Sequence, residues 1–464
     1  MTTVLIAALA FFTIIAYLRT DLAVFLIIAL LPSYLIRFGV LGIPATFLEA
    51  MILITFAIWF LRATKLHFIT WFNKRTERQP YPFGLEIIAI LIVAFFGTAA
   101  AGFSLPAMGI FKAYFFEPIL LFILIMNVLP GEKGRKRILV ALLIGAVSTA
   151  LLALFQQMTG LTISNPFWAA AETRRVVSWF GYPNAVGLFL APLVLLLSGW
   201  LFTLCKEKER IILKITIVAT IVLSVAAIYF AKSEGALIGI LAGAWLMAIF
   251  ANKYTRLAAI IGTVIIGAFI FITPTYRTYA LEKITLRDLS GEIRKQQWRE
   301  TAQSFHGLPI VFGHGLSGYP AAIAPLHQDG IFFNRDRIEN FHSILYGSAE
   351  LRAKYWQPVE IYLYPHNIFL NFWSELGILG LIAFIWLIGK YLFLTLKIFF
   401  RRHNYLALGL FGAMTTIVVH GLVDVPYFKN DLSAMFFILL ALAASLLADN
   451  YLQSKRTDKK SLNL

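Results

Sequence analysis

The stretch from residue 211 to residue 230, IILKITIVATIVLSVAAIYF, decides the fold class because it is long, apolar and carries a single charge, that of Lys214. An α-helix of about 20 residues crosses the roughly 30 Å hydrocarbon core of a bilayer. The composition of the whole chain is similarly apolar, since 59% of its 464 residues are hydrophobic and only 14% are charged. Soluble domains are about 25% charged. A soluble core could not hide this much apolar surface, so we expect a membrane protein.

Thirteen apolar runs of comparable length predict an all-α polytopic membrane protein with 12–13 transmembrane helices. The first run is short and lacks the basic start and small-residue cleavage site of a signal peptide, so we expect it to be retained. The runs are 2–18, 22–36, 44–63, 84–103, 108–129, 136–157, 183–204, 211–230, 235–251, 256–273, 366–396, 404–423 and 429–450.

Lysine and arginine collect on alternate sides of the runs, which predicts the orientation. One set of connections holds 23 of them: 19–21, 62–83, 130–137, 205–214, 252–256, 397–403 and 451–464. The short connections on the other side hold five: Arg37, Arg174, Arg175, Lys232 and Lys429. The positive-inside rule places the first set in the cytoplasm, and segments 158–182 and 274–365 outside.

The predicted organisation has four parts. Residues 1–273 form transmembrane helices 1–10, and 274–365 form an ordered, partly helical extracytoplasmic loop that caps the bundle. Residues 366–450 form transmembrane helices 11–13, and 451–464 form a basic cytoplasmic tail. Within the loop, 282–306 has apolar residues at helical spacing, and FGHGLSGYP (312–320) is typical of a turn whose backbone approaches another segment closely.

A few ionisable residues on the outer side are candidates for chemistry. Arg174 and Arg175 either snorkel to headgroups and pair with Glu172, or one of them grips an anion, because a guanidinium binds phosphate oxygens with two parallel hydrogen bonds. Arg294, beside Trp298 on the expected loop helix, is either in a surface ion pair or part of the same anion site.

Two further candidates lie in the eleventh run, YPHNIFLNFWSELGILG. His366 is either a helix cap or a general base, since the ordinary pKa of histidine is near physiological pH. Glu375, about two and a half turns further along, needs a partner at that depth and could hold a helix pair together.

Other classes of site are not indicated. The histidines of the loop, His306, His314, His327 and His342, fit no zinc spacing, so we expect no metal site, and no motif indicates a cofactor. The basic residues form short clusters between apolar runs, so nucleic acid is not an expected partner. The single cysteine, Cys205, excludes a disulfide framework.

Three segments of the sequence resemble the O-antigen ligase family, which includes O-antigen ligases, O-antigen polymerases and related protein-glycosylating oligosaccharyltransferases. RVVSWFGYPNAVG, from Arg175, is similar to the family's Arg and Pro-Asn block, with Asn184 in the asparagine position. GEIRKQQWRETAQSFHGLPIVFGHGLSGY matches its Arg-X-X-X-Trp helix and Gly-X-Gly turn, with Arg294 and Trp298. PHNIFLNFWSELGILG matches its His-Asn start and internal Glu, which are His366, Asn367 and Glu375.

One further block supports the resemblance, and one segment departs from it. His420, Gly421 and Asp424 resemble a further block near the penultimate helix. The family often has a Ser-Arg pair after its eighth helix, where this chain has AKSEGALIG, and Lys232 could supply the missing charge.

The resemblance implies a GT-C-type glycosyltransferase in the bacterial inner membrane, acting on its periplasmic face on an undecaprenyl-pyrophosphate-linked glycan. The acceptor would be a hydroxyl of a glycolipid such as lipid A core, of a growing glycan or of a protein. Arg175, Arg294 and Arg174 would hold the pyrophosphate and His366 would be the base. Asn367, Glu375, Trp298, Asn184 and Lys232 would support them, without a metal or cofactor. We expect a ligase; the alternatives are a polymerase of the same family, a lipid-linked glycan transporter or a structural membrane protein.

Overall fold

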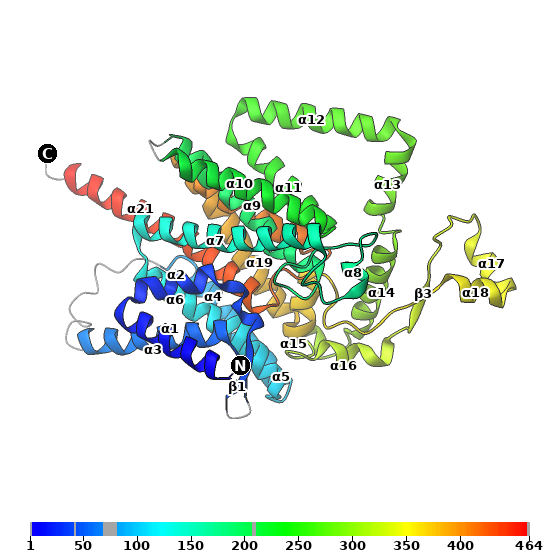
Figure 1. Ribbon diagram of the computed structural model, residues 1–464, viewed down its shortest axis with the longest axis horizontal. Helices are drawn as coiled ribbons and strands as arrows, with labels where there is room; N and C mark the ends of the chain where they lie inside the picture. Colours follow the sequence, from blue (N-terminus) through cyan, green and yellow to red (C-terminus); the bar gives the residue numbers. More distant parts are fainter. Residues whose placement is uncertain (1, 41–42, 68–80, 207–209, 462–464) are drawn as a thin grey trace.

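The computed structural model describes residues 2–40, 43–67, 81–206 and 210–461 of the chain (Figure 1). Its N-terminal helices are α1 (Thr2–Leu18), α2 (Thr20–Ala29), α3 (Phe47–His67), α4 (Gly84–Ala100), α5 (Leu105–Ile110), α6 (Glu117–Val128), α7 (Gly131–Thr159) and α8 (Pro166–Ala169). The helices that follow are α9 (Pro183–Lys206), α10 (Ile211–Phe230), α11 (Glu234–Ala251), α12 (Lys253–Ile272), α13 (Pro274–Ile284) and α14 (Leu289–Ser304). The remaining helices are α15 (Pro309–Phe312), α16 (Tyr319–Ile323), α17 (Phe341–Gly347), α18 (Ala349–Tyr355), α19 (Ile368–Arg402), α20 (Tyr405–His420) and α21 (Asn430–Ser461).

The other regular elements are short. Strands β1 (Arg37–Val40) and β2 (Ile43–Thr46) form one antiparallel pair, and β3 (Gly330–Phe332) and β4 (Trp356–Pro358) form another. Two 3₁₀ segments, η1 (Leu31–Leu35) and η3 (Ala324–Leu326), and the π-helical segment η2 (Phe111–Phe116) complete the set.

Most of each of the thirteen predicted apolar runs is helical, although the run 44–63 begins in β2, so the all-α polytopic fold class is confirmed. Within the described residues, eight helical segments are long and apolar enough to span a membrane, and α1, α2, α4 and α20 are shorter apolar helices. Run 108–129 is α5, η2 and α6 joined end to end. Run 22–36 is broken after Ala29 into α2 and η1, where Pro32 cannot donate to a continuing helix.

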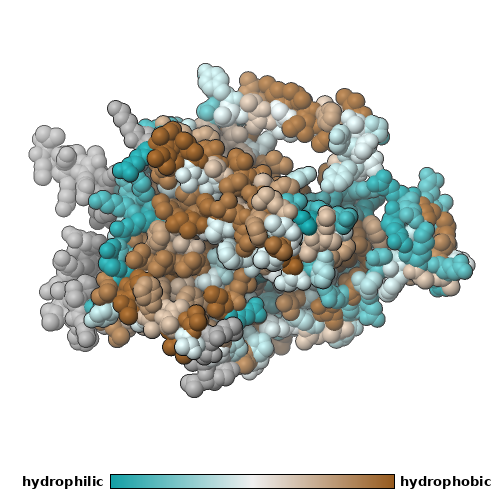
Figure 2. All heavy atoms as spheres, in the orientation of Figure 1, coloured by the Kyte–Doolittle hydropathy of each residue, from teal (hydrophilic) through white to brown (hydrophobic). Residues whose placement is uncertain are grey.

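Most of the long apolar helices run roughly along the long axis of the molecule, whereas α13 and α14 run across it (Figure 1). Hydrophobic surface covers the middle of the bundle, and hydrophilic surface gathers at the two ends of that axis (Figure 2). The C-terminus lies at one end, while α14, α17 and α18 lie at the other (Figure 1). Most of the predicted cytoplasmic connection 62–83, part of 205–214 and the last residues of the tail 451–464 lie outside the described residues.

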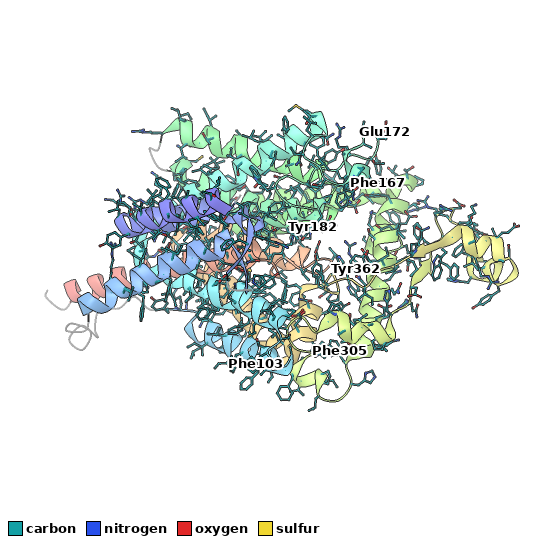
Figure 3. All side chains as sticks on the ribbon, turned by 60° about the horizontal axis from the view of Figure 1, so that its bottom comes forward. Phe103, Phe167, Glu172, Tyr182, Phe305 and Tyr362 are labelled. Carbon is teal, nitrogen blue, oxygen red and sulfur yellow. The ribbon has the colours of Figure 1, made fainter. Side chains whose placement is uncertain are left out.

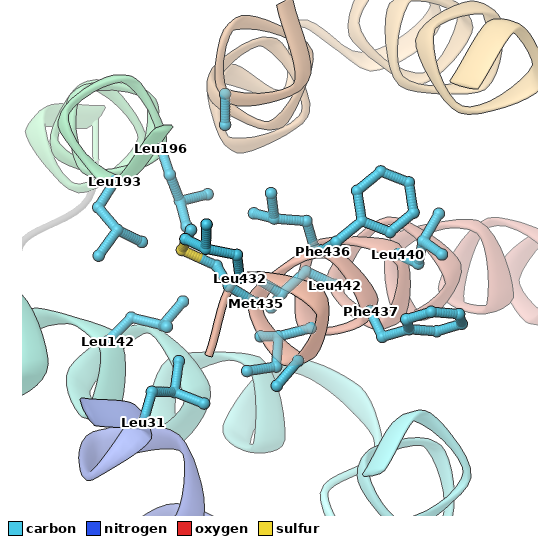
Figure 4. Packing of buried hydrophobic residues seen from close by; sticks show 14 of the residues in the cluster. Leu31, Leu142, Leu193, Leu196, Leu432, Met435, Phe436, Phe437, Leu440 and Leu442 are labelled. Atoms are coloured by element: carbon cyan, nitrogen blue, oxygen red, sulfur yellow. The ribbon is translucent and has the colours of Figure 1, made fainter. Parts of the chain in front are cut away.

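Helix α21 is the core of the bundle, with 94% of its most apolar window buried. Leu432 and Met435 of α21 lie toward Leu142 of α7 and Leu193 of α9 (Figure 4), and Phe436 stacks on Phe384 of α19 with ring centroids 5.9 Å apart. Because lipid tails are as apolar as leucine, this packing depends on close complementarity rather than on exclusion of water. Helix α21 begins directly after the segment 421–429, and this fixes the position of that segment.

Helix α12 differs from the other apolar helices because none of its residues is buried. It packs along α11 and leads into α13, and it lies apart from the rest of the bundle at the top of Figure 1. A single apolar run cannot reveal whether its neighbours are helices or lipid, so the sequence predicts the helix but not its isolation.

The outer segment 274–365 is partly helical, and it contains α13 to α18 and the β3–β4 pair. The predicted helix 282–306 is interrupted between Ile284 and Leu289, because Leu286 adopts a left-handed conformation with φ of 52°. At the other end of the chain, α21 continues to Ser461, so most of the predicted tail 451–464 is helical.

Candidate active site

Residues 421–424, between α20 and the start of α21, form a turn on which several distant segments converge; we name it the 421–424 turn. Its backbone carbonyls accept three hydrogen bonds from outside the turn. Ile368 N donates to Gly421 O at 2.7 Å and Asn367 Nδ2 donates to Leu422 O at 3.0 Å. Arg294 Nε donates to Val423 O at 2.9 Å. The turn therefore connects α14 of the cap to the beginning of α19.

Asp424 links the same turn to the start of α9. Its Oδ2 accepts a hydrogen bond from Asn184 Nδ2 at 3.3 Å, and Asn184 Oδ1 accepts one from Arg175 Nη2 at 3.2 Å. Arg175 is anchored further by Nε, which donates to Ala231 O at 3.0 Å, and by Nη2, which also reaches Lys232 O at 3.4 Å. Arg175 and Arg294, which are 119 positions apart in the sequence, thus meet at one turn.

Both arginines keep donors that the protein does not use. In the described part of the chain, Nη1 of Arg175 and both terminal nitrogens of Arg294 have no protein acceptor. A guanidinium fixed through Nε with its terminal nitrogens available is arranged to bind an oxyanion.

His366 lies at the same place, directly before α19. Its Nδ1 is 2.9 Å from Gln297 Oε1 of α14. The ring edges of Tyr362 and Tyr364 surround it at centroid distances of 4.9 and 5.2 Å. Trp298 Nε1 donates to Pro365 O at 2.9 Å and so ties α14 to the segment that precedes the histidine.

The backbone and the charges around His366 are unusual. Its φ of 47° is left-handed, a conformation that costs of order 1–3 kcal/mol for a residue other than glycine and is concentrated at functional sites. Burial lowers the pKa of the imidazole below its ordinary value, Asp424 opposes this change, and Arg294 adds to it. The imidazole is therefore neutral at physiological pH, with Nε2 lacking a protein partner among the described residues.

Asn367 has a structural role that explains its position. Its Oδ1 accepts hydrogen bonds from Phe369 N and Leu370 N, both at 3.0 Å, which is an N-cap for α19. Since its Nδ2 also binds the 421–424 turn, the side chain holds the start of α19 and therefore His366 against that turn.

Arg174 lies apart from this group although it adjoins Arg175 in the sequence. Its Nε and Nη2 donate to Ala169 O at 3.2 and 3.0 Å, and its Nη1 donates to Gln157 O at 3.0 Å. All three nitrogens thus bind backbone carbonyls and secure the 158–182 segment.

Glu234 stands in the arginine place of the Ser-Arg pair that the resemblance predicts, and Lys232 lies two residues before it. The backbone carbonyl of Lys232 contacts Arg175, and its side chain is exposed. Glu234 instead binds the outer segment, with Oε2 at 2.6 Å from Lys283 Nζ and Oε1 accepting from Tyr279 OH at 3.1 Å. The carboxylate therefore connects α11 with α13.

Glu375 connects the cap to the membrane helices. Its Oε2 accepts a hydrogen bond from Ser317 N at 2.9 Å. Next to it, Gly377 breaks the helical conformation of α19 with a φ of 72°, and a Cβ on Gly313 would lie 2.6 Å from Gly377 N. The close approach predicted for FGHGLSGYP therefore exists, and its partners are α19 and, through Leu316 N and Gly97 O at 3.0 Å, α4.

The loop histidines are separated by their contacts. His314 Nε2 is 2.9 Å from Ser304 Oγ, and His327 lies between Glu300 Oε2 at 3.3 Å and Val359 O at 3.0 Å. Within the described ranges, no three His, Cys, Asp or Glu side chains are grouped as metal ligands would be.

Sequence reasoning did not find two residues beside this site. Gln297 contacts His366, but a glutamine on a polar helix carries no signal of its own. Lys429 holds its Nζ 3.7 Å from the ring centroid of Tyr182, in cation–π contact near Asn184. The one indication in the sequence is that Lys429 lies on the side of the membrane that has few basic residues.

Aromatic residues mark the level of the site. Phe103, Phe167, Tyr182, Phe305 and Tyr362 lie across the end of the bundle that carries the cap, as does Glu172 (Figure 3). Aromatic side chains are enriched where membrane meets water, so we expect the membrane boundary near this end of the bundle.

The fold and the site define a multi-pass membrane protein whose paired arginines and histidine meet beneath an outer cap. Residues 219–385 match the protein-family model described as O-antigen ligase, so this segment is similar to that family. The match supports glycosyltransferase activity of the O-antigen ligase or polymerase type, with a lipid-linked glycan and an acceptor as substrates. No curated protein matches the chain.

Proposed function

We propose that this protein transfers a glycan from undecaprenyl pyrophosphate to an acceptor hydroxyl at the periplasmic face of the bacterial inner membrane, as a GT-C-type O-antigen ligase acting on lipid A core. One observation carries the proposal. Among the described residues, Arg175 and Arg294 have guanidinium nitrogens without a protein acceptor at the same turn where Nε2 of His366 has no protein partner.

The reaction needs two kinds of group. His366 Nε2 accepts the proton of the acceptor hydroxyl while its oxygen attacks the anomeric carbon of the donor sugar. The bond between that carbon and the pyrophosphate oxygen breaks in the same displacement, so the configuration inverts. The guanidinium groups of Arg175 and Arg294 stabilise the charge that develops on the leaving pyrophosphate, a task that does not require a metal.

The remaining candidate residues support these two functions. Asn184 orients Arg175, Asn367 fixes the start of α19, and Trp298 fixes Pro365 beside the histidine. Glu375 anchors the cap. Arg174 stabilises the outer segment, and the exposed ammonium of Lys232 adds positive charge beside Arg175.

The test uses an undecaprenyl-pyrophosphate-linked oligosaccharide and a lipid A core acceptor, with purified protein, EDTA, and neither ATP nor an ion gradient. The wild-type protein is expected to transfer the glycan. His366→Ala should lose transfer by about 10²-fold or more and still bind the donor. Full activity of this variant would remove His366 from the mechanism.

The polymerase alternative has the same site and is decided by the acceptor. Deletion of the gene for a ligase leaves full-length glycan unattached on its lipid carrier, whereas deletion of the gene for a polymerase leaves short surface glycans.

The transporter alternative is less well supported. Lys112 and Lys390, two charged residues within the apolar runs, form ion pairs with Glu49 at 3.0 Å and Glu86 at 2.8 Å, which is a structural use. Movement of the donor across vesicles without transfer would favour a transporter.

A further inference from the structure

Among the described residues, Gln297 is the one side chain that forms a hydrogen bond with the His366 ring. It lies on α14, is only 3% exposed, and places Oε1 2.9 Å from His366 Nδ1. The neighbouring Trp298 binds Pro365 O, and Arg294, one turn earlier, binds Val423 O. Three residues on one face of α14 therefore bind the 421–424 turn and the segment around His366. The contact of Gln297 with the histidine is one of several that fix α14 in this position.

The chemistry of this contact decides which ring nitrogen carries the proton. An amide oxygen accepts hydrogen bonds and cannot donate them, so Nδ1 must be the protonated nitrogen of the neutral ring. Nε2 then carries the lone pair. A partner at one ring nitrogen fixes the tautomer and so determines which of the two nitrogens is available as a base.

We propose that Gln297 is a positioning residue that fixes His366 as the Nδ1–H tautomer and thereby makes Nε2 the proton acceptor for the incoming hydroxyl. This inference rests on the proposed function, because it assigns a role to Gln297 in the reaction for which His366 is the base.

An amide suits this position better than the carboxylate that orients histidine in many hydrolases. The groups that face His366 are Asp424 from the 421–424 turn, Arg294 from α14, and the rings of Tyr362 and Tyr364. A second carboxylate here would raise the affinity of the ring for a proton and would repel a pyrophosphate. Gln297 fixes the tautomer without adding negative charge.

The direct test is ¹⁵N NMR of the full-length protein in detergent micelles with ¹⁵N-labelled histidine, and His366→Ala identifies the resonances. In the wild-type protein, neutral His366 is expected to carry its proton on Nδ1. Gln297→Leu should lose this preference, and Gln297→Glu should keep it while raising the pKa of His366. A proton on Nε2 in the wild-type protein, or an unchanged tautomer in Gln297→Leu, would overturn the inference.

Transfer from the undecaprenyl-pyrophosphate-linked oligosaccharide provides the second readout. Gln297→Leu should lower kcat, by at most the roughly 10²–10⁴-fold that a general base contributes, and leave the donor KM nearly unchanged. Gln297→Glu should move the acid limb of the pH profile to higher pH. Gln303→Glu is the matched control, since it adds the same charge at an exposed position of the same helix and should leave the profile unchanged.

The outcomes separate this inference from the proposed function. An inactive His366→Ala variant together with a fully active Gln297→Leu variant of unchanged pH profile would contradict only the role of Gln297. A fully active His366→Ala variant would contradict the proposed base itself, and the NMR measurement would still report whether Gln297 fixes the tautomer.

Discussion

The two adjacent arginines Arg174 and Arg175 differ in the acceptors to which their guanidinium groups donate hydrogen bonds. All three guanidinium nitrogens of Arg174 donate to backbone carbonyl groups. In Arg175, by contrast, Nη1 has no acceptor among the described residues. Each arginine makes three hydrogen bonds within the protein, so the nitrogens that these bonds occupy, and not their number, leave Arg175 available to a ligand.

This difference predicts opposite effects of the same substitution. Arg175→Gln should lower transfer per folded molecule by about 10²–10³-fold, the usual loss on removing one group that stabilises developing charge. Arg174→Gln should lower the melting temperature in detergent and keep transfer per folded molecule near the wild-type rate. Equal losses of activity in the two variants would contradict the distinction.

The environment of His366 predicts the pH dependence of transfer. Burial lowers its pKa below the ordinary value of 6.5, so the neutral form that acts as base persists to a lower pH. The rate should fall as pH decreases through this lowered pKa and should level off above it. A profile of kcat/KM between pH 5 and 8 measures the inflection, and an inflection above 6.5 that depends on His366 would disagree.

At this scale the sequence predicts residue types better than contacts. The resemblance identifies Arg175, Arg294 and His366, and the structure brings all three to the 421–424 turn. The contact between Gln297 and His366 joins residues 69 positions apart and follows from the docking of α14 on the membrane helices. No local pattern encodes that docking.

Among the elements, α19 shows how the outer cap is attached. Gly377 interrupts this helix with a left-handed conformation, and a Cβ there would collide with the carbonyl of Val311 in α15. The apolar run 366–396 predicts the helix correctly, but the interruption depends on the approach of Val311 and Gly313 from the cap, which the sequence does not reveal.

Gly377→Ala should therefore destabilise the protein by at least about 2 kcal/mol, from the left-handed backbone and the collision together. Gly389→Ala, on the same helix, is the matched control, because a Cβ there meets nothing within 4 Å and alanine favours a helix. Thermal unfolding in detergent measures both. If Gly377→Ala matched the wild-type melting temperature, α15 and α19 would not be packed as described.

At the scale of the whole molecule, the distribution of charge predicts which end faces the cytoplasm. Cys205, the single cysteine, is exposed at the end of α9, and Leu363, 75% exposed, lies in the outer segment. With spheroplasts and a membrane-impermeant maleimide, Cys205 should react only after permeabilisation. In a Cys205→Ser background, Leu363→Cys should react at once, and the reverse pattern would invert the proposed orientation.

The 421–424 turn has a consequence for how such enzymes diversify. Partners from three parts of the chain end on four residues whose place is set by the core helix α21, so few changes are tolerated there. The tip of the cap, by contrast, has its own small core of Phe341, Leu345 and Tyr355. We expect evolutionary change at the tip of the cap to alter which acceptor is selected. The site proposed to break the donor bond, at the 421–424 turn, should be inherited unchanged.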